Sequence, residues 1–153
     1  MDGKNGIKVY DLETISGIEG DGPIVKISKV IMWRSLNIGA KFTVIVLGQQ
    51  TEANQDIVIL VAAKSDAESE SESLMSLPYY VFSSLISRFK IMAACNLAER
   101  YTNQEGKFYV RCGDTEYEVI AKFEPTEEIE TETGPKFLRF EKLTLEFVPT
   151  TAG

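Results

Sequence analysis

The segment KFYVRCGDTEYEVIAKF, residues 107–123, has the clearest secondary-structure pattern in the chain. Polar and apolar residues alternate over 107–112 and again over 115–123, and only Gly113 and Asp114 lie between the two runs. Alternation is typical of a strand that is buried on one face, and a two-residue loop that begins with glycine is typical of a tight turn. The segment therefore predicts an antiparallel hairpin with a type I′ or II′ turn.

The short loop also predicts which residues of the hairpin face each other. On one face the predicted pairs are Cys112 with Thr115, Val110 with Tyr117, and Phe108 with Val119. That face is nearly all apolar. On the other face Arg111 lies opposite Glu116, and opposite charges across two strands stabilise their pairing.

Five further segments have strand patterns. They are residues 7–15, 24–33, 41–47, 56–62 and 136–148. The run 56–62 is apolar on both faces and rich in β-branched residues, which favours a central strand covered on both sides. In 136–148 the apolar face changes side near Glu141–Lys142, which indicates a bulge or a bend between sheets.

One helix is expected, over residues 77–101. Ser76 is suited to the N-cap position, and Pro78 falls in the first turn, where a missing N–H is tolerated. One apolar stripe recurs at three- and four-residue steps, formed by Phe82, Leu85, Ile86, Phe89, Met92 and Leu97. These patterns predict a β-rich α+β fold. It has about seven mostly antiparallel strands, arranged as a barrel or sandwich, and one amphipathic helix between strands 4 and 5.

Composition fits one globular domain over residues 1–153, with 44% hydrophobic residues and a net charge of −7. Two acidic segments, 63–76 and 124–135, are expected to be exposed loops. The chain has no histidine, which removes Ser-His-Asp and Cys-His catalysis and histidine-ligated zinc. Cys95 and Cys112 are expected to be buried, free and unreactive. We therefore expect a protein that is not an enzyme and that has no cofactor, metal site or small-molecule substrate.

Two groups of residues are candidates for contact with a partner protein. The acidic candidates are Glu68, Glu70 and Glu72 in the first acidic segment and Glu128, Glu130 and Glu132 in the second. The aromatic candidates are Tyr79 and Tyr80 at the start of the expected helix, because exposed aromatic side chains are typical of contact surfaces. The alternative is that the acidic segments are only solvated and that the tyrosines are covered by the sheet.

A third group suggests nucleic-acid binding. It consists of the basic residues Lys26, Lys29, Arg34 and Lys41 and the single tryptophan, Trp33. Cations for phosphate and a ring for base stacking are what a single-strand groove requires. The alternative, which we favour from the sequence, is that Trp33 ends a core strand.

The organisation is loosely similar to small structural proteins of viruses and phages, such as matrix proteins and tail-tube subunits. That resemblance concerns architecture only. The sequence thus predicts a non-catalytic structural or interaction protein that self-associates or binds another protein. Two alternatives stay open: a single-strand nucleic-acid-binding module of oligonucleotide-binding type, and an acidic regulator or inhibitor that mimics an anionic partner. Without an apolar signal segment or membrane span, the expected location is the cytoplasm or a particle assembled there.

Overall fold

A computed structural model of the chain describes residues 8–13, 22–49, 57–66, 68, 70–99, 102–125 and 141–150. Its strands are β1 (Val9–Asp11), β2 (Phe42–Gln49), β3 (Ile57–Lys64), β4 (Glu72–Pro78), β5 (Gln104–Cys112), β6 (Thr115–Pro125) and β7 (Glu141–Pro149). Its helices are α1 (Pro23–Asn37), the short 3₁₀ helix η1 (Tyr79–Val81) and α2 (Phe82–Met92). The strands form one sheet in the order β1-β5-β6-β7-β2-β3-β4.

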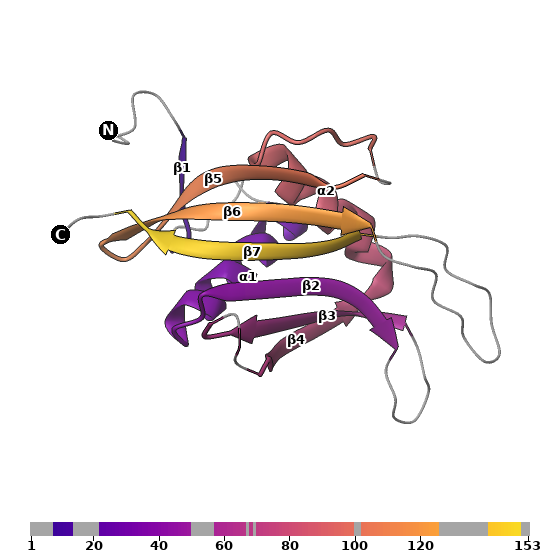
Figure 1. The fold of residues 1–153 in the computed structure, drawn as a ribbon, viewed down its shortest axis with the longest axis horizontal. Helices are drawn as coiled ribbons and strands as arrows, with labels where there is room; N and C mark the ends of the chain where they lie inside the picture. Colours follow the sequence, from indigo (N-terminus) through magenta and orange to yellow (C-terminus); the bar gives the residue numbers. More distant parts are fainter. Residues whose placement is uncertain are drawn as a thin grey trace.

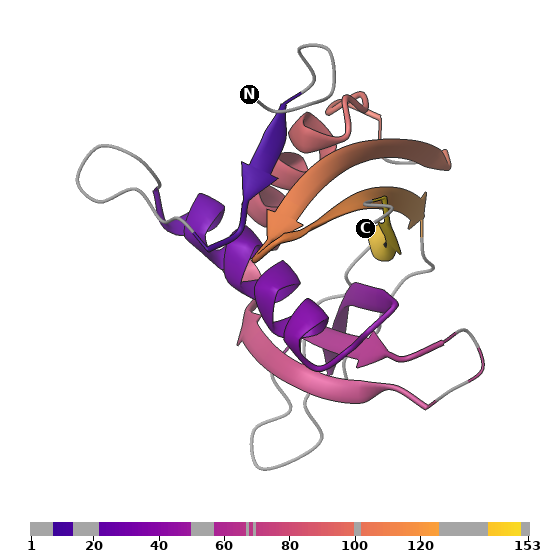
Figure 2. The same ribbon diagram turned by 90° about the vertical axis from the view of Figure 1, so that its left-hand side faces the viewer.

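The predicted fold class is confirmed: the structure is a β-rich α+β fold with a helix between the fourth and fifth strands. Every strand pair in the sheet is antiparallel except β1 with β5. The sheet is open, with β1 and β4 at its edges, rather than a closed barrel or a sandwich. Both helices lie on one side of it (Figure 1). The sheet curves around them, and α1 lies between the two edge strands (Figure 2).

The hairpin has the predicted register. Cys112 pairs with Thr115, Val110 with Tyr117, Phe108 with Val119, and Arg111 with Glu116. Gly113 has φ +63°, a left-handed conformation that a residue with a side chain rarely adopts. Local alternation and turn chemistry were therefore sufficient to specify this part of the fold.

The predicted strand 24–33 is wrong, because these residues belong to α1. Pro23 occupies the first turn of that helix, and the buried side of α1 carries Ser28, Ile31, Met32 and Ser35. These residues recur at helical spacing. The sequence prediction counted Ser28 as an outward, polar residue. The remaining apolar residues then seemed to alternate with polar ones, as in a strand.

The buried serines of α1 are tolerated because their hydroxyl groups have partners. Ser28 Oγ donates to the carbonyl of Val25 at 2.7 Å, and Ser35 Oγ donates to the carbonyl of Ile31 at 2.8 Å. Thr43 of β2 donates through Oγ1 to Ser35 Oγ at 2.6 Å. A satisfied hydroxyl costs little to bury, so α1 packs against β2 through polar as well as apolar atoms.

The second half of the first acidic segment is a strand rather than a loop, and the helix after it is shorter than predicted. β4 begins at Glu72, and Pro78, expected inside the helix, is its last residue. β4 is an edge strand, and proline is tolerated at the edge of a sheet, where one side of the strand has no ladder hydrogen bonds to lose. α2 ends at Met92, where Ala94 turns left-handed with φ 59°. Ser76 therefore does not cap the helix, and Leu97 lies beyond it.

One face of the sheet packs against the helices and forms the core. Its buried side chains include Ile45 and Leu47 of β2, Ile59 and Val61 of β3, Phe108 and Val110 of β5, Val119, Ala121 and Phe123 of β6, and Leu143, Leu145 and Phe147 of β7. Leu85 and Phe89 of α2 are fully buried against this face. β3, predicted to be covered on both sides, is not: Leu60 on its other face is 38% exposed.

Two predicted strands are described only in part. Of residues 7–15, the structure shows β1 over Val9–Asp11. Of residues 136–148, it shows β7 from Glu141 onward, with alternate residues buried along the strand. Residues 136–140 lie outside the described part of the chain, so the predicted bulge near Glu141–Lys142 stays a prediction.

A buried ion pair joins α2 to β7. Lys90 Nζ lies 2.9 Å from Glu141 Oε1 and also donates to the carbonyl of Glu99 at 2.7 Å. The two side chains are only 2% and 5% exposed. Removing one charge of a buried pair leaves the other without compensation, which costs far more than breaking an exposed pair.

Lys90→Met should therefore lower the free energy of unfolding by about 3–5 kcal/mol, measured by urea denaturation. The double variant Lys90→Met, Glu141→Leu should recover most of that loss, because no unpaired charge remains. Lys107→Met is the matched control, since it removes the cation of the exposed pair with Glu118. It should leave the unfolding free energy nearly unchanged. Equal losses in the single and double variants would show that the charges are not what matters at this position.

Candidate interaction surface

The outward side of α1 carries exposed apolar and basic side chains together. Lys26, Val30 and Trp33 follow each other at steps of four and three residues, so they lie on one side of the helix, and Arg34 flanks them. Val30 is 37% exposed and Trp33 is 39% exposed. We call the group formed by these four residues with Leu12 and Glu13 the α1 surface.

A recess of about 420 Å³ lies within the α1 surface, lined by Leu12, Glu13, Val30, Trp33 and Arg34. Leu12 is buried, whereas Glu13 is exposed. Trp33 Nε1 lies 3.5 Å from Glu13 Oε2, and Glu13 Oε1 accepts from the backbone N–H of Gly113 at 3.0 Å. Glu13, which lines the recess, therefore links α1 to the turn of the β5–β6 hairpin through these two hydrogen bonds.

The residues of the nucleic-acid hypothesis lie on and next to α1, not on the face of a barrel. Lys26, Lys29, Trp33 and Arg34 are in α1, and Lys41 is exposed in the turn before β2. Lys29 is half-buried. The interpretation of Trp33 as a core residue is wrong, because a helix that buries Ile31 and Ser35 points Trp33 outward.

Sequence reasoning missed Leu12, Glu13 and Val30. Val30 follows Lys26 by four residues and precedes Trp33 by three, so helical spacing would have placed it beside them. Leu12 and Glu13 join the surface only because β1 pairs in parallel with β5, which brings Asp11 beside Arg111. Nothing in the local pattern signals that pairing.

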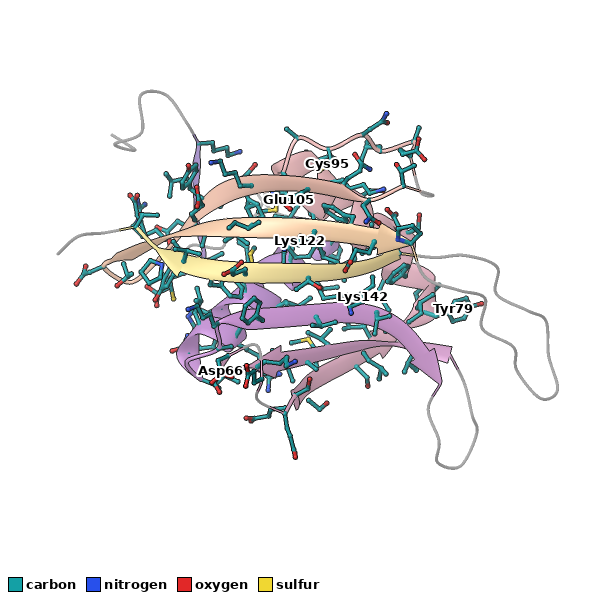
Figure 3. The ribbon with its side chains drawn as sticks, viewed as in Figure 1. Asp66, Tyr79, Cys95, Glu105, Lys122 and Lys142 are labelled. Carbon is teal, nitrogen blue, oxygen red and sulfur yellow. The ribbon has the colours of Figure 1, made fainter. Side chains whose placement is uncertain are left out.

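Tyr79 and Tyr80 are exposed, as their role in contact would require. Both belong to η1, and Tyr79 lies at the opposite end of the structure from Asp66 (Figure 3). Tyr80 is 73% exposed and Tyr79 is 51% exposed, and their rings meet edge to face at 6.1 Å. They are a second exposed aromatic group, separate from the α1 surface.

The acidic candidates are only partly described. Glu68 and Glu70 are exposed in the connection between β3 and β4, and Glu72 is exposed at the start of β4. Glu128, Glu130 and Glu132 lie outside the described residues. Where the structure shows them, the glutamates are accessible to a basic partner, and their use by such a partner stays a prediction.

Both cysteines are free and half-buried. Burial raises the pKa of the Cys95 thiol above its usual value; Lys90 opposes that shift and Glu141 adds to it. Burial likewise raises the pKa of Cys112, with further contributions from Glu13 and Asp11. A raised pKa leaves less thiolate at neutral pH, and the thiolate is the nucleophile. Neither cysteine has the environment of an activated thiol.

Comparisons with known proteins show no family for this chain: no protein-family model matches it, and no curated protein matches it. Within the part of the chain that the structure describes, no helix is long and apolar enough to cross a membrane. The same residues bring together no group of three or more histidine, cysteine or acidic side chains that could hold a metal ion. The α1 surface, with its exposed tryptophan and recess, is therefore the feature on which a function is best argued.

Alkylation kinetics test the assignment of the thiols. At pH 7–8 both cysteines of the native protein should react with iodoacetamide more slowly than in the same protein in concentrated urea. The reason is that the raised pKa values lower the thiolate fraction and burial limits access. Mass spectrometry after a timed quench reads each cysteine separately. A native rate at Cys95 above the denatured rate would indicate an activated thiol and contradict this account.

Proposed function

We propose that the protein is a non-catalytic interaction protein that self-associates and that the α1 surface is its contact. The observation that carries this proposal is the exposure of Trp33 beside Val30, over a recess of about 420 Å³. Tryptophan, tyrosine and arginine dominate the binding energy of protein interfaces, and a pocket beside an aromatic side chain suits insertion of a partner residue. Lys26 and Arg34 supply cations at the border of the surface, and Glu13 supplies an anion.

The expected affinity from the α1 surface alone is modest. Full burial of a large apolar side chain contributes about 1.5–3 kcal/mol, and Trp33 has already lost more than half of its exposed area on folding. Association costs on the order of 4–15 kcal/mol in lost motional freedom. Trp33 and Val30 therefore supply specificity and part of the free energy, and a lasting assembly requires further contacts.

Binding of a single nucleic-acid strand is a second candidate function. It is favoured by the same observation, because Trp33 is exposed and shares its helix with Lys26 and Arg34. Those two cations are eight residues apart, about 12 Å along the helix, and Trp33 directly precedes Arg34. This arrangement allows a base to stack on Trp33 while phosphates contact the cations, and it predicts binding that weakens steeply with salt.

Trp33→Ser should weaken self-association at least tenfold, measured as weight-average mass by light scattering behind a size-exclusion column over a range of loading concentrations. The change removes the largest exposed apolar group of the surface and leaves the buried side of α1 intact. Tyr80→Ser is the matched control, since it makes the same kind of change in the exposed aromatic group of η1, which is not part of the α1 surface. It should not alter the mass.

Three results would contradict the α1 proposal. In the first, Tyr80→Ser, and not Trp33→Ser, lowers the mass, which would place the contact at η1. In the second, the wild-type protein is a monomer at every concentration. In the third, nucleic acid co-elutes at low salt, seen as excess absorbance at 260 nm, and is lost in high salt and in Trp33→Ser; that result would establish the second candidate.

A further inference from the structure

The side of β1 that faces α2 carries a tyrosine between two basic side chains. Tyr10 pairs with Val110 in the parallel ladder of β1 and β5, and its ring meets the ring of Phe108 edge to face at 6.1 Å between centroids. Phe108 and Val110 are buried on the face of the sheet that the helices cover. Tyr10 therefore points toward the helices, and α2 lies beside β1 (Figure 2).

Lys8 and Arg88 both lie against that ring. Lys8 Nζ is 4.7 Å from the centroid of the Tyr10 ring, and Arg88 Cζ is 5.5 Å from the same centroid. Both distances are within the range in which the face of an aromatic ring attracts a cation. Because the two distances share one end, the cations are no farther apart than their sum, about 10 Å. We call these three residues the Tyr10 cluster.

The positive charge of the Tyr10 cluster is not balanced by a carboxylate. Arg111 of β5 shows the usual arrangement, since its guanidinium lies 3.3 Å from Asp11 Oδ2 and 4.0 Å from Glu116 Oε2. Lys8 and Arg88 form no such pair with any residue that the structure describes. Two cations are thus gathered at one ring, and the anion that would complete them does not come from the described chain.

One N–H of Arg88 also lacks a hydrogen-bond acceptor. Nε is buried, and none of the described groups accepts from it. Bulk solvent does not reach a buried atom, so the acceptor has to be a bound ion or an ordered water. The excess of positive charge at Tyr10 favours an anion, and a guanidinium is well suited to bind one, because its N–H groups match the oxygens of carboxylate and phosphate.

We propose that the Tyr10 cluster is a binding site for a phosphate group, either free phosphate or a phosphate monoester. A phosphate carries up to two negative charges near neutral pH and offers several acceptor oxygens, so it accepts from Arg88 and Lys8 together. A single carboxylate would balance only one of the two cations. The site shares no residue with the α1 surface, and it is therefore a binding activity separate from the proposed self-association.

The test is a titration of nitrogen-15-labelled protein with inorganic phosphate at neutral pH and constant ionic strength, followed by NMR. The Nε–Hε signal of Arg88, identified by its absence from Arg88→Gln, should shift and reach saturation. Backbone amide signals of residues 8–11 should shift with the same Kd. In Arg88→Gln these amide shifts should show a Kd for phosphate that is at least tenfold higher.

Two further variants keep the test independent of how Arg88→Gln folds. Lys8 is exposed, so Lys8→Gln removes one cation of the site without disturbing the core, and it should also raise the Kd. Lys122→Gln is the matched control, because Lys122 is an exposed cation of β6 outside the Tyr10 cluster. It should leave the Kd for phosphate unchanged. Urea midpoints of all three variants report whether each is folded.

The outcomes separate a phosphate site from its alternatives. Tighter binding of glycerol 3-phosphate than of inorganic phosphate would identify a monoester as the ligand, and equal binding would identify free phosphate; both support the proposal. An equal response to chloride at the same ionic strength would overturn it, since that is a general salt effect. A Kd that is the same in wild type, Arg88→Gln and Lys8→Gln would also overturn it, and the buried N–H would then be assigned to an ordered water.

Discussion

Two helices cover a curved sheet of seven strands from one side only, and most features of this molecule follow from that constraint. α1 must pack against α2, β2 and the edge strand β4 at once. It therefore buries a broad side that contains Ile31, Met32 and two serines. The opposite side of α1 carries Val30 and Trp33, which stay partly exposed beside Leu12 and Glu13. A helix with apolar side chains on both sides is suited to a second contact besides the sheet, which is the basis of the proposal for the α1 surface.

Because the helices cover only one side of the sheet, its other face is left without a helical layer. Its β5–β6–β7 half has the alternation of a sheet that faces water, with charged residues outside and apolar residues inside. Its β2–β3 half has apolar residues on both faces. The apolar residues left outside at α1 and at β2–β3 lie on opposite sides of the sheet, so they form two separate surfaces.

The parts of the fold that could be predicted are those whose signal is local. The hairpin register required only the alternation of 107–123 and the two turn residues, and β2 and β3 were evident from their β-branched runs. The errors arise where tertiary packing decides. α1 was predicted to be a strand because its buried serines, whose hydroxyl groups have partners, were counted as outward residues. β4 was predicted to be a loop because its outward residues are polar, although it is an edge strand. The same error placed Trp33 in the core, so its exposure and its neighbours Leu12 and Glu13 could not be predicted.

Because Trp33 is the only tryptophan in the chain, its fluorescence reports directly on the surface at the centre of this account. The most direct measurement is the emission spectrum and its quenching by acrylamide as the protein is diluted from high to low concentration. If association covers the α1 surface, emission will be blue-shifted and protected from acrylamide at high concentration, and both effects will disappear on dilution. Association, seen by scattering in the same samples, without any change in emission or quenching would show that Trp33 stays in water, and the α1 surface would not be the contact.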